Sequence, residues 1–417
     1  MTEVRRLVPH VAEGVADADT VTWARAMAAA FLRPRMDPAD LARAAADYAG
    51  QRLRGVYETG DPAPVATLRS WDSLMTVPGG EVAVDAITSI GVRSTHRRRG
   101  LLRAVLVDDL AEAARAGTPM AALTSTQGSL YERFGFGLAF STRSLRLDTR
   151  AADFRDPGPT GRLRTLDVAT LPSAAAPVHD RARRRHPGSM GRSTRSWTTL
   201  MTGENLFSGM RPDRERHAVL WSDATGRPGG YVVYRVAQDW LGDSAEIAVL
   251  DLQATTPESY RELWRHLASL DLVGAVSWSD ASVDEPLPWL LTDLRPVTAG
   301  TSREMLWLRV LDVPAALTAR RYPVTDRVVL GVQDPAGHAA GTWLLDTSDP
   351  TAPEVATTTR DADVALDAAT LGSLYLGGID PRVLARCGRL EELTPGAAGR
   401  LARLFAPPSV PWNGTRF

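Results

Sequence analysis

The sequence has very little cysteine and no lysine. Cys387 is the only cysteine among 417 residues, which excludes a disulfide bond within the chain and a Cys-x-x-Cys metal site. We expect Cys387 to be a buried structural thiol rather than a nucleophile. The 48 basic residues are all arginine. Together with the abundance of alanine, we interpret this as a coding bias without functional meaning.

A large net charge and long apolar runs are absent as well. The formal net charge is −1 and the pI is about 6.7, so the chain as a whole does not attract nucleic acid. No stretch approaches the roughly 20 consecutive apolar residues of a membrane-spanning helix, and the first residues lack the apolar core of a signal peptide. The seven histidines show no metal-ligand spacing. We therefore expect a cytoplasmic protein with no metal, no nucleic-acid partner and no membrane partner.

The chain is long enough to bury several hydrophobic cores. A length of 417 residues suggests about two to four domains. Strand-like and helix-like stretches are mixed along the chain, which predicts an α/β (α+β) architecture. We divide it into segments 1–150, 151–300 and 301–417, with the Pro/Gly-rich residues 156–161 as a linker between the first two.

Residues 90–102 are the most informative part of the sequence, because an apolar run is followed by an Arg/Gly turn and then by an amphipathic helix. The apolar residues of this helix recur at spacings of three and four and share one face: Leu102, Val105, Leu106, Leu110 and Ala113. Gly117 and Pro119 end the helix. At its start, backbone N–H groups have no partner within the helix, and the positive end of the dipole favours an anion.

The residues of the turn suit a pyrophosphate. Gly100 has no Cβ and lets a phosphate approach the main chain, while Arg97, Arg98 and Arg99 supply permanent charge and forked donors. An arginine triplet alone is more often a solvated face. The neighbouring His96 is compatible with a phosphate contact and equally with an ordinary turn residue.

A second apolar run, residues 120–123, predicts a strand, and a segment bearing Tyr131 follows it. This order of strand, phosphate turn, helix, strand and tyrosine resembles the GNAT family of acetyl-CoA-dependent N-acetyltransferases. The GNAT motif Arg/Gln-x-x-Gly-x-Gly/Ala occurs here as Arg97-x-x-Gly100-x-Leu102. Leu102 departs from the general pattern, but residues 95–103 resemble one branch, the Eis (enhanced intracellular survival) acetyltransferases.

The resemblance covers nearly the whole chain. Its further landmarks are residues 131–137, 287–293, 306–309 with 313–317, 371–377, and the terminal Phe417. It implies a GNAT acetyl-CoA-binding catalytic domain over 1–150, a degenerate GNAT-like domain over 151–300, and a sterol-carrier-protein-like domain over 301–417. That last resemblance does not imply lipid transport, because a fold alone does not define a function.

The local patterns agree with these three segments. In the first, we expect a helix around residues 21–31 and strands within 63–71 and 81–92. In the second, residues 218–221 and 230–235 form a hairpin, and a strand over 245–252 leads through Thr256 and Pro257 into a helix. No Arg-x-x-Gly turn lies between this strand and the helix that follows it. In the third, a helix from Asp312, two strands and two later helices follow, the second opening at Thr394.

The resemblance also implies how acetyl-CoA binds. The pantetheine would pair with a splayed strand formed by Ile90, Gly91 and Val92, with Gly91 permitting a bulge. A backbone N–H of that strand would polarise the thioester carbonyl. The remaining expected cofactor contacts are Leu101, Leu102, Thr126 and Ser129.

Two groups would carry the proton transfers. Tyr131 occupies the place of the family's general acid, and a phenol titrating near ~10 can donate a proton and recover it from solvent; the alternative is core packing against Phe134 and Phe136. In Eis enzymes the C-terminal carboxylate acts as general base, and here it belongs to Phe417. It would work through water or by holding the ammonium. Prolines in the tail, residues 406–417, favour its delivery, whereas a frayed end is the alternative.

The acceptor is less well defined. Eis-like enzymes acetylate polycationic amines, typically aminoglycosides, in a wide pocket bearing carboxylates. Here Arg33 and Arg416 stand where acids are expected, so attraction for a cation becomes repulsion. We therefore expect either altered acetylation of aminoglycosides or an acceptor amine that is partly anionic. Trp23, Phe31 and Trp71 either line an apolar acceptor pocket or pack in the core.

We conclude from the sequence that the chain is an Eis-like N-acetyltransferase that uses acetyl-CoA and acts on a small-molecule primary amine. The alternative is a non-catalytic protein that binds acyl-CoA or another ligand. The resemblance further implies a homo-oligomer, expected to be a hexamer.

Overall fold

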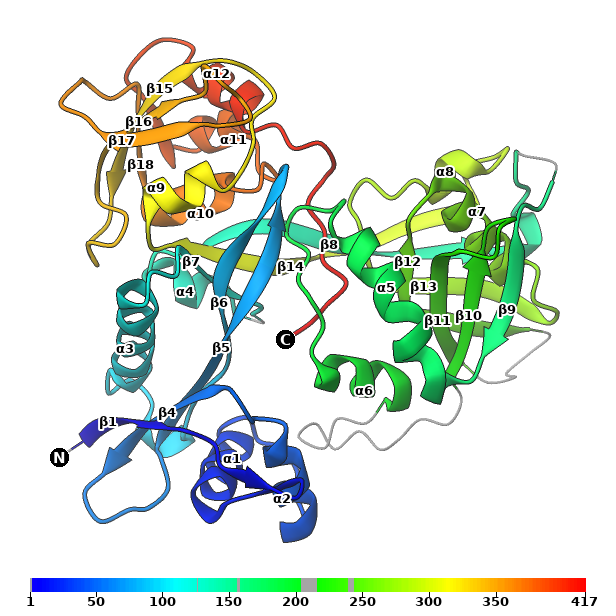
Figure 1. Ribbon diagram of the computed structural model, residues 1–417, viewed down its shortest axis with the longest axis horizontal. Helices are drawn as coiled ribbons and strands as arrows, with labels where there is room; N and C mark the ends of the chain where they lie inside the picture. Colours follow the sequence, from blue (N-terminus) through cyan, green and yellow to red (C-terminus); the bar gives the residue numbers. More distant parts are fainter. Residues whose placement is uncertain (1, 126, 156–157, 204–215, 239–243) are drawn as a thin grey trace.

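The computed structural model describes residues 2–125, 127–155, 158–203, 216–238 and 244–417 (Figure 1). The expected cofactor residue Thr126 and the first two residues of the proposed linker lie outside these ranges. No helix in the described residues is long and apolar enough to span a membrane.

One sheet of 12 described strands passes through the first two segments, in the order β1-β4-β5-β6-β7-β14-β8-β13-β12-β11-β10-β9. Its first half consists of β1 (Thr2–Leu7), β4 (Arg52–Glu58), β5 (Ala66–Val77), β6 (Gly80–Val92), β7 (Met120–Leu123), β14 (Val297–Val310) and β8 (Gly137–Asp148). A small hairpin, β2 (Val11–Ala12) with β3 (Val15–Ala16), lies beside it. The predicted strands around residues 63–71, 81–92 and 120–123 are thus confirmed.

Helices cover both faces of this first half. They are α1 (Ala18–Ala30), α2 (Pro38–Ala46), α3 (Leu101–Arg115) and the short α4 (Ser129–Glu132). Adjacent residues of β4 show the two faces, because Leu53 packs in the cluster of α1 and α2 whereas Arg54 reaches the carboxylates of α3. The predicted amphipathic helix is confirmed as α3, whose buried residues include Val105, Leu106 and Leu110.

Strands β6 and β7 separate after a short parallel pairing. They pair from Val84 opposite Met120 to Ile87 opposite Leu123, and β6 then continues without β7 to Val92, still paired with β5. This is the splayed pair that the sequence analysis expected. The bulge is not at Gly91, however, because the register with β5 shifts between Thr67 and Arg69.

The bulge corresponds to Ser89, which has a positive φ of 55°. Gly91 serves close packing instead. A Cβ there would lie 2.9 Å from the Cβ of Ala30 and 3.1 Å from a ring atom of Phe31. The small residue therefore lets the end of α1 approach β6.

The second half of the sheet contains the predicted hairpin and the strand–helix pair. Its strands are β9 (Arg162–Leu166), β10 (Arg216–Ser222), β11 (Pro228–Gln238), β12 (Ala245–Ala254) and β13 (Val273–Ala281). Its helices are α5 (Leu171–Arg183), α6 (Thr194–Thr202), α7 (Pro257–Ala268) and α8 (Leu287–Leu290). Thr256 caps α7, since its hydroxyl accepts from Ser259 N at 3.1 Å and the Ser259 hydroxyl accepts from Thr256 N at 3.1 Å. This capping box explains why α7 begins where the sequence predicts.

The third segment has its own five-stranded sheet, in the order β17-β16-β15-β18-β19. These strands are β15 (Arg327–Gln333), β16 (Gly341–Asp346), β17 (Glu354–Thr357), β18 (Val364–Asp367) and β19 (Leu390–Glu392). The helices are α9 (Val313–Thr318), α10 (Ala368–Leu374), α11 (Pro381–Arg386) and α12 (Ala397–Leu404).

Four expectations are corrected here. Three helices rather than two follow the second strand of this sheet, and the last begins at Ala397 after Gly396, not at Thr394. Cys387 is exposed, because α11 is a short surface helix that ends there. The boundary predicted after residue 300 falls inside β14, which pairs with both β7 and β8 and completes the first half of the sheet.

After α12 the chain returns to the centre of the molecule as a strap, residues 406–417 (Figure 1). Trp412 is buried among the apolar residues of the second half of the sheet. Its indole Nε1 donates to the Asp280 carbonyl oxygen at 2.7 Å, and its own carbonyl oxygen accepts from the Ser189 hydroxyl at 2.7 Å. The chain terminus is therefore packed rather than frayed.

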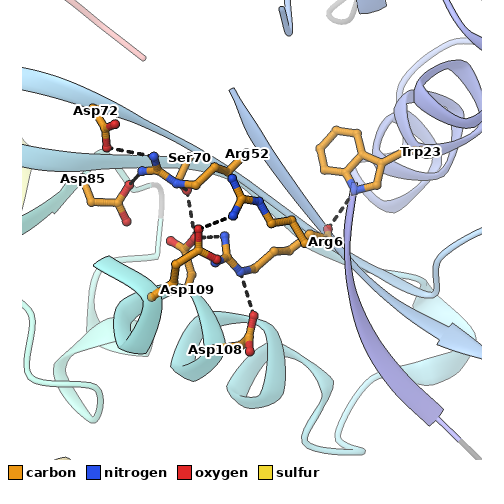
Figure 2. Close-up of polar contacts among 10 residues, drawn as sticks. Arg6, Trp23, Arg52, Ser70, Asp72, Asp85, Asp108 and Asp109 are labelled. Carbon is orange, nitrogen blue, oxygen red and sulfur yellow. Dashed lines mark hydrogen bonds and ion pairs between the residues drawn. The ribbon is translucent and has the colours of Figure 1, made fainter. Parts of the chain in front are cut away.

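A buried charge cluster attaches α3 to the first half of the sheet (Figure 2). The Arg54 side chain is 0% exposed and donates to three carboxylates of α3: Asp108, Asp109 and Glu112. Because removing one partner of a buried ion pair leaves an uncompensated charge, this cluster holds α3 in one position. The turn at the start of α3 is held with it.

The same cluster contains a second arginine. Arg52 donates to Asp72 at 2.8 Å and to Asp85 at 2.5 Å. Asp85 is 0% exposed. Its burial and the nearby Asp109 carboxylate raise the pKa of Asp85 well above its usual value, so folding favours the protonated acid.

This raised pKa predicts how stability depends on pH. Because the pKa of Asp85 is higher in the folded than in the unfolded protein, the associated stability is complete below the unfolded pKa and is lost as the pH rises through the folded pKa. Asp85→Asn, which mimics the neutral acid, should raise the free energy of unfolding by about 1 to 3 kcal/mol at about pH 9 and much less at about pH 4. Denaturant unfolding at both pH values measures this difference. Asp72→Asn is the matched control, since Asp72 shares Arg52 but its side chain is 80% exposed; a loss of stability in Asp85→Asn at both pH values would contradict the prediction.

Candidate active site

Two hollows meet at the C-terminal residue. The first, called here the strand groove, has a volume of about 1110 Å³ and opens where β6 and β7 separate. It is bounded by residues 30–33, 87–92, 96–98, 100–103, 123–125, 127, 130–131, 133–134 and 417. The second, called here the aromatic hollow, has a volume of about 820 Å³ and is lined by both halves of the sheet and by residues 412–417. Phe417 lines both.

The turn before α3 presents open main chain to the strand groove. Arg98 has a φ of 62° and Gly100 a φ of 77°. No heavy atom of the described residues lies within 4 Å of a Cβ placed on Gly100, and no described side chain caps the start of α3. Open backbone N–H groups, the helix dipole and adjacent arginines together fit a pyrophosphate.

Most of the expected cofactor residues line this groove. They are Ile90, Gly91, Val92, Arg97, Arg98, Gly100, Leu101 and Leu102. Arg99 and Ser129 do not line it. Arg99 turns to Glu58 at 3.3 Å, where His96 Nε2 also lies at 3.1 Å, and Ser129 is exposed at the start of α4.

Tyr131 lies between the core and the groove. It is 9% exposed and lines the strand groove, while its ring meets Phe136 edge-on at a centroid distance of 6.2 Å. The same side chain therefore packs in the core and lines the groove, and its role as general acid stays a prediction. Burial raises the pKa of Tyr131 above its usual value, which keeps the phenol protonated.

The end of the chain is held at the junction of the hollows. The Thr124 hydroxyl donates to a terminal carboxylate oxygen of Phe417 at 2.8 Å, and the Phe417 ring meets Trp71 edge-on at 5.7 Å. Thr124 directly follows β7. The sequence analysis did not identify Thr124 as a site residue. The signal that could have found it is a polar side chain directly after a buried strand.

A buried ion pair in the second half of the sheet holds the strap. The Arg192 guanidinium donates to Asp251 at 2.6 Å, to the Gly414 carbonyl oxygen at 3.2 Å and to the Thr415 hydroxyl at 3.3 Å. Burial alone would raise the pKa of Asp251, but Arg192 and the hydroxyl of Tyr231 hold it below its usual value. Asp251 is therefore an anion that keeps Arg192 directed at the strap.

Asn413 shapes the last turn of the strap. It is 1% exposed; its Oδ1 accepts from Thr415 N at 2.9 Å and its Nδ2 donates to the Thr415 carbonyl oxygen at 2.8 Å. Neither feature had a local sequence signal. The Arg192 contacts join residues more than two hundred positions apart, and the turn depends on a single amide side chain.

The expected acceptor residues divide between hollow and core. Phe31, Arg33, Trp71 and Arg416 line the aromatic hollow. Trp23 does not, since it is 0% exposed and its indole donates to the Arg54 carbonyl oxygen at 2.7 Å. For Trp23 the structure corrects the pocket prediction in favour of core packing.

Arg416 also differs from the expectation. Its guanidinium forms an ion pair with Asp280, so its positive charge is largely balanced. The repulsion of cations that the sequence suggested for this position is therefore offset.

Comparisons with known proteins agree with this architecture. Models of an acetyltransferase (GNAT) domain match residues 13–139 and 188–310, and a sterol carrier protein domain model matches residues 313–414. This confirms two GNAT domains followed by a domain of the sterol carrier type.

Individual relatives match along most of the chain. An uncharacterized N-acetyltransferase of Streptomyces griseus is 36% identical over 95% of this chain and 97% of its own. The N-acetyltransferase Eis of Mycobacterium tuberculosis is 35% identical over 80% of this chain and 81% of its own. The crystal structure of Eis1 from Mycobacterium abscessus superimposes with a TM-score of 0.85 at 31% identity, covering 100% of both chains.

The strap contacts predict how firmly the chain end is held. Asn413→Ala removes the two hydrogen bonds to Thr415, so local opening should become easier and carboxypeptidase should release Phe417 about 5- to 100-fold faster. Mass spectrometry of the shortened chain measures this rate. Ser409→Ala is the control, because that hydroxyl donates to the Arg185 carbonyl oxygen at 2.7 Å in the same strap, further from the end. Equal release rates in the two variants would show that Asn413 does not hold the terminus.

Proposed function

Because this chain belongs to the Eis family of GNAT N-acetyltransferases, we propose that it transfers the acetyl group of acetyl-CoA to the nitrogen of a small-molecule primary amine. One observation carries the proposal. Phe417, the last residue, is held by Thr124 where the strand groove and the aromatic hollow meet. A donor in the groove and an acceptor in the hollow would therefore both lie next to the terminal carboxylate.

The residues of the strand groove fit acetyl-CoA, which supplies the activated acetyl thioester. The open turn at Arg98 and Gly100 would hold the pyrophosphate at the start of α3. The β7 side of β6 beyond Ile87 has no strand partner among the described residues. Its backbone groups are therefore available to hold the pantetheine and to polarise the thioester carbonyl.

The terminal carboxylate and Tyr131 would move the protons. An amine arrives mostly as ammonium, and the Phe417 carboxylate would hold it and accept its proton directly or through water. A free carboxylate titrates near ~3.5, so it is a weak base that depends on position. The amine nitrogen then bonds to the carbonyl carbon and loses a second proton to solvent as the carbon–sulfur bond breaks. Tyr131 would give its phenol proton to the sulfur and regain one from solvent, leaving an N-acetylated amine and free CoA thiol.

The acceptors in this proposal are primary amines, and acetylation of aminoglycosides would have an altered specificity. Arg33 lines both hollows and repels a polycation, whereas Asp280 balances Arg416. Solvent weakens both the repulsion by Arg33 and the attraction between Asp280 and Arg416, because these groups are partly exposed. Family membership further supports the prediction of a homo-oligomer, which sedimentation of the purified protein would test.

Two changes test the proton-transfer roles. Tyr131→Phe, and separately one glycine appended after Phe417, should each lower kcat for acetyl transfer by about 100-fold, because general acid–base groups contribute about 10²- to 10⁴-fold. Thiol release from acetyl-CoA measures turnover on a panel of primary amines and aminoglycosides.

The controls for this test are Tyr57→Phe, which removes a hydroxyl on β4, and one glycine inserted after Gly337, at a turn with open space around it. Both should retain near-normal turnover and the thermal stability of the native protein. Normal turnover in the chain extended after Phe417 would exclude the terminal carboxylate as the base.

The burial of Tyr131 predicts the alkaline side of the pH profile. Since burial raises its pKa above the usual value near 10, the phenol stays protonated through neutral and mildly alkaline pH. We expect kcat for acetyl transfer to show no loss from Tyr131 ionisation below about pH 10. A descending limb at about pH 8 or 9 that vanishes in Tyr131→Phe would contradict this assignment.

A further inference from the structure

Arg69 of β5 is buried without an acidic partner. It is 8% exposed, and its guanidinium lies over the Tyr48 ring at 4.6 Å and near the Trp71 ring at 5.6 Å. Its Nε atom has no hydrogen-bond acceptor among the described residues, and no described carboxylate forms an ion pair with it. Burying a charge without an opposite charge is unfavourable, so this arrangement calls for a partner from outside the chain.

The guanidinium faces a space large enough for such a partner. Arg69 lines the aromatic hollow together with Trp71 and Phe417. Burial lowers the pKa of Arg69 to about 10, so the side chain still carries its charge near neutral pH. The two neighbouring aromatic rings restrict the guanidinium, which reduces the entropy lost when it binds a ligand.

The acidic side chains of the hollow are already paired. Each of the three described acidic residues that line it forms an ion pair with an arginine: Asp72 with Arg52, Asp251 with Arg192, and Asp280 with Arg416. The terminal carboxylate of Phe417 also lies at this hollow, but Arg33 and Arg69 both lack an acidic partner among the described residues. These two guanidinium groups outnumber the one terminal carboxylate, so the hollow keeps an excess of positive charge, with the buried part of it at Arg69.

We propose that the acceptor amine carries an anionic group, in its simplest form a carboxylate, and that Arg69 binds this group while the amine lies at the terminal carboxylate. This inference rests on the proposed acetyl transfer. A guanidinium can donate two parallel hydrogen bonds to a carboxylate; the Nε–H of Arg69 is itself buried, so its two terminal amino groups would be the donors. The substrate class is thus a small amino acid or a related amino-carboxylate.

The placement of Arg69 supports binding of both ends of such a molecule. In the sheet register Arg69 lies opposite Thr88, next to the bulge from which β6 continues along the strand groove. Trp71 lies beside the Arg69 guanidinium at 5.6 Å and beside the Phe417 ring at 5.7 Å. One aromatic ring therefore separates the anion-binding group from the residue that would receive the ammonium.

The test compares carboxylates with their amides. Wild-type protein is assayed by thiol release from acetyl-CoA with L-phenylalanine, β-alanine, 4-aminobutyrate and 6-aminohexanoate, each beside its primary amide. We expect at least one carboxylate to be acetylated, and Arg69→Met to lower kcat/KM for that acceptor by about 30-fold or more, mainly through KM. Its amide should change by less than about twofold. Comparing the variant with the wild type for each acceptor cancels the intrinsic reactivity of the amine.

Two further variants separate charge from structure. Arg69→Lys keeps the charge and should recover part of the carboxylate preference. Arg360→Met, an exposed arginine of the third segment, should leave every rate unchanged. If Arg69→Met slows carboxylate and amide acceptors equally, or if the wild type prefers the amides and the variant keeps that preference, Arg69 is structural and the inference is overturned while acetyl transfer stands.

A binding measurement distinguishes failure of this inference from failure of the proposed function. Calorimetry with 4-aminobutyrate and L-phenylalanine, in the presence of CoA, reports binding without turnover. Saturable binding that Arg69→Met abolishes, with no acetylation of any amine, would support anion recognition and overturn acetyl transfer. Absence of both carboxylate binding and carboxylate turnover would overturn the anionic acceptor.

Discussion

The buried ion pair of Arg192 and Asp251 determines where the C-terminal residue lies in the folded protein. Asp251 lies on β12 and Arg192 in the loop before α6, and Arg192 uses its remaining donors on Gly414 and Thr415. Because a buried guanidinium separated from its carboxylate is strongly unfavourable, the strap has one preferred path. That path brings Phe417 to Thr124 in the first half. The second half of the sheet thus contributes to the candidate site by positioning the strap.

The third segment contributes to the same result. Its buried apolar residues continue into one cluster with those of β5, β6 and β14, so the third segment has a defined place against the sheet. Only from that place can the short strap reach the junction of the two hollows. The position of Phe417 at the candidate site therefore depends on all three segments.

Local chemistry made the first half of the site predictable. Gly100 before an amphipathic helix, and Thr256 with Pro257 before another, are signals within a few residues. The bulge at Ser89, with its φ of 55°, could not be predicted from residue preference, because a serine rarely adopts that conformation. The exposure of Cys387 and the burial of Trp23 depend on packing between distant segments. The insertion of β14 between β7 and β8 depends on strands that are far apart in the sequence.

The charge of the aromatic hollow was still harder to predict from the sequence. From the sequence alone, Arg33 and Arg416 are equivalent, since each replaces an expected acid. Asp280 balances Arg416, whereas Arg69, which no sequence pattern marks, is buried without an acidic partner among the described residues. Charge at a site is therefore a property of pairs, and the pairs exist only once the chain has folded. A buried cation beside two aromatic rings differs from an exposed one, because solvent screens its attraction for an anion far less.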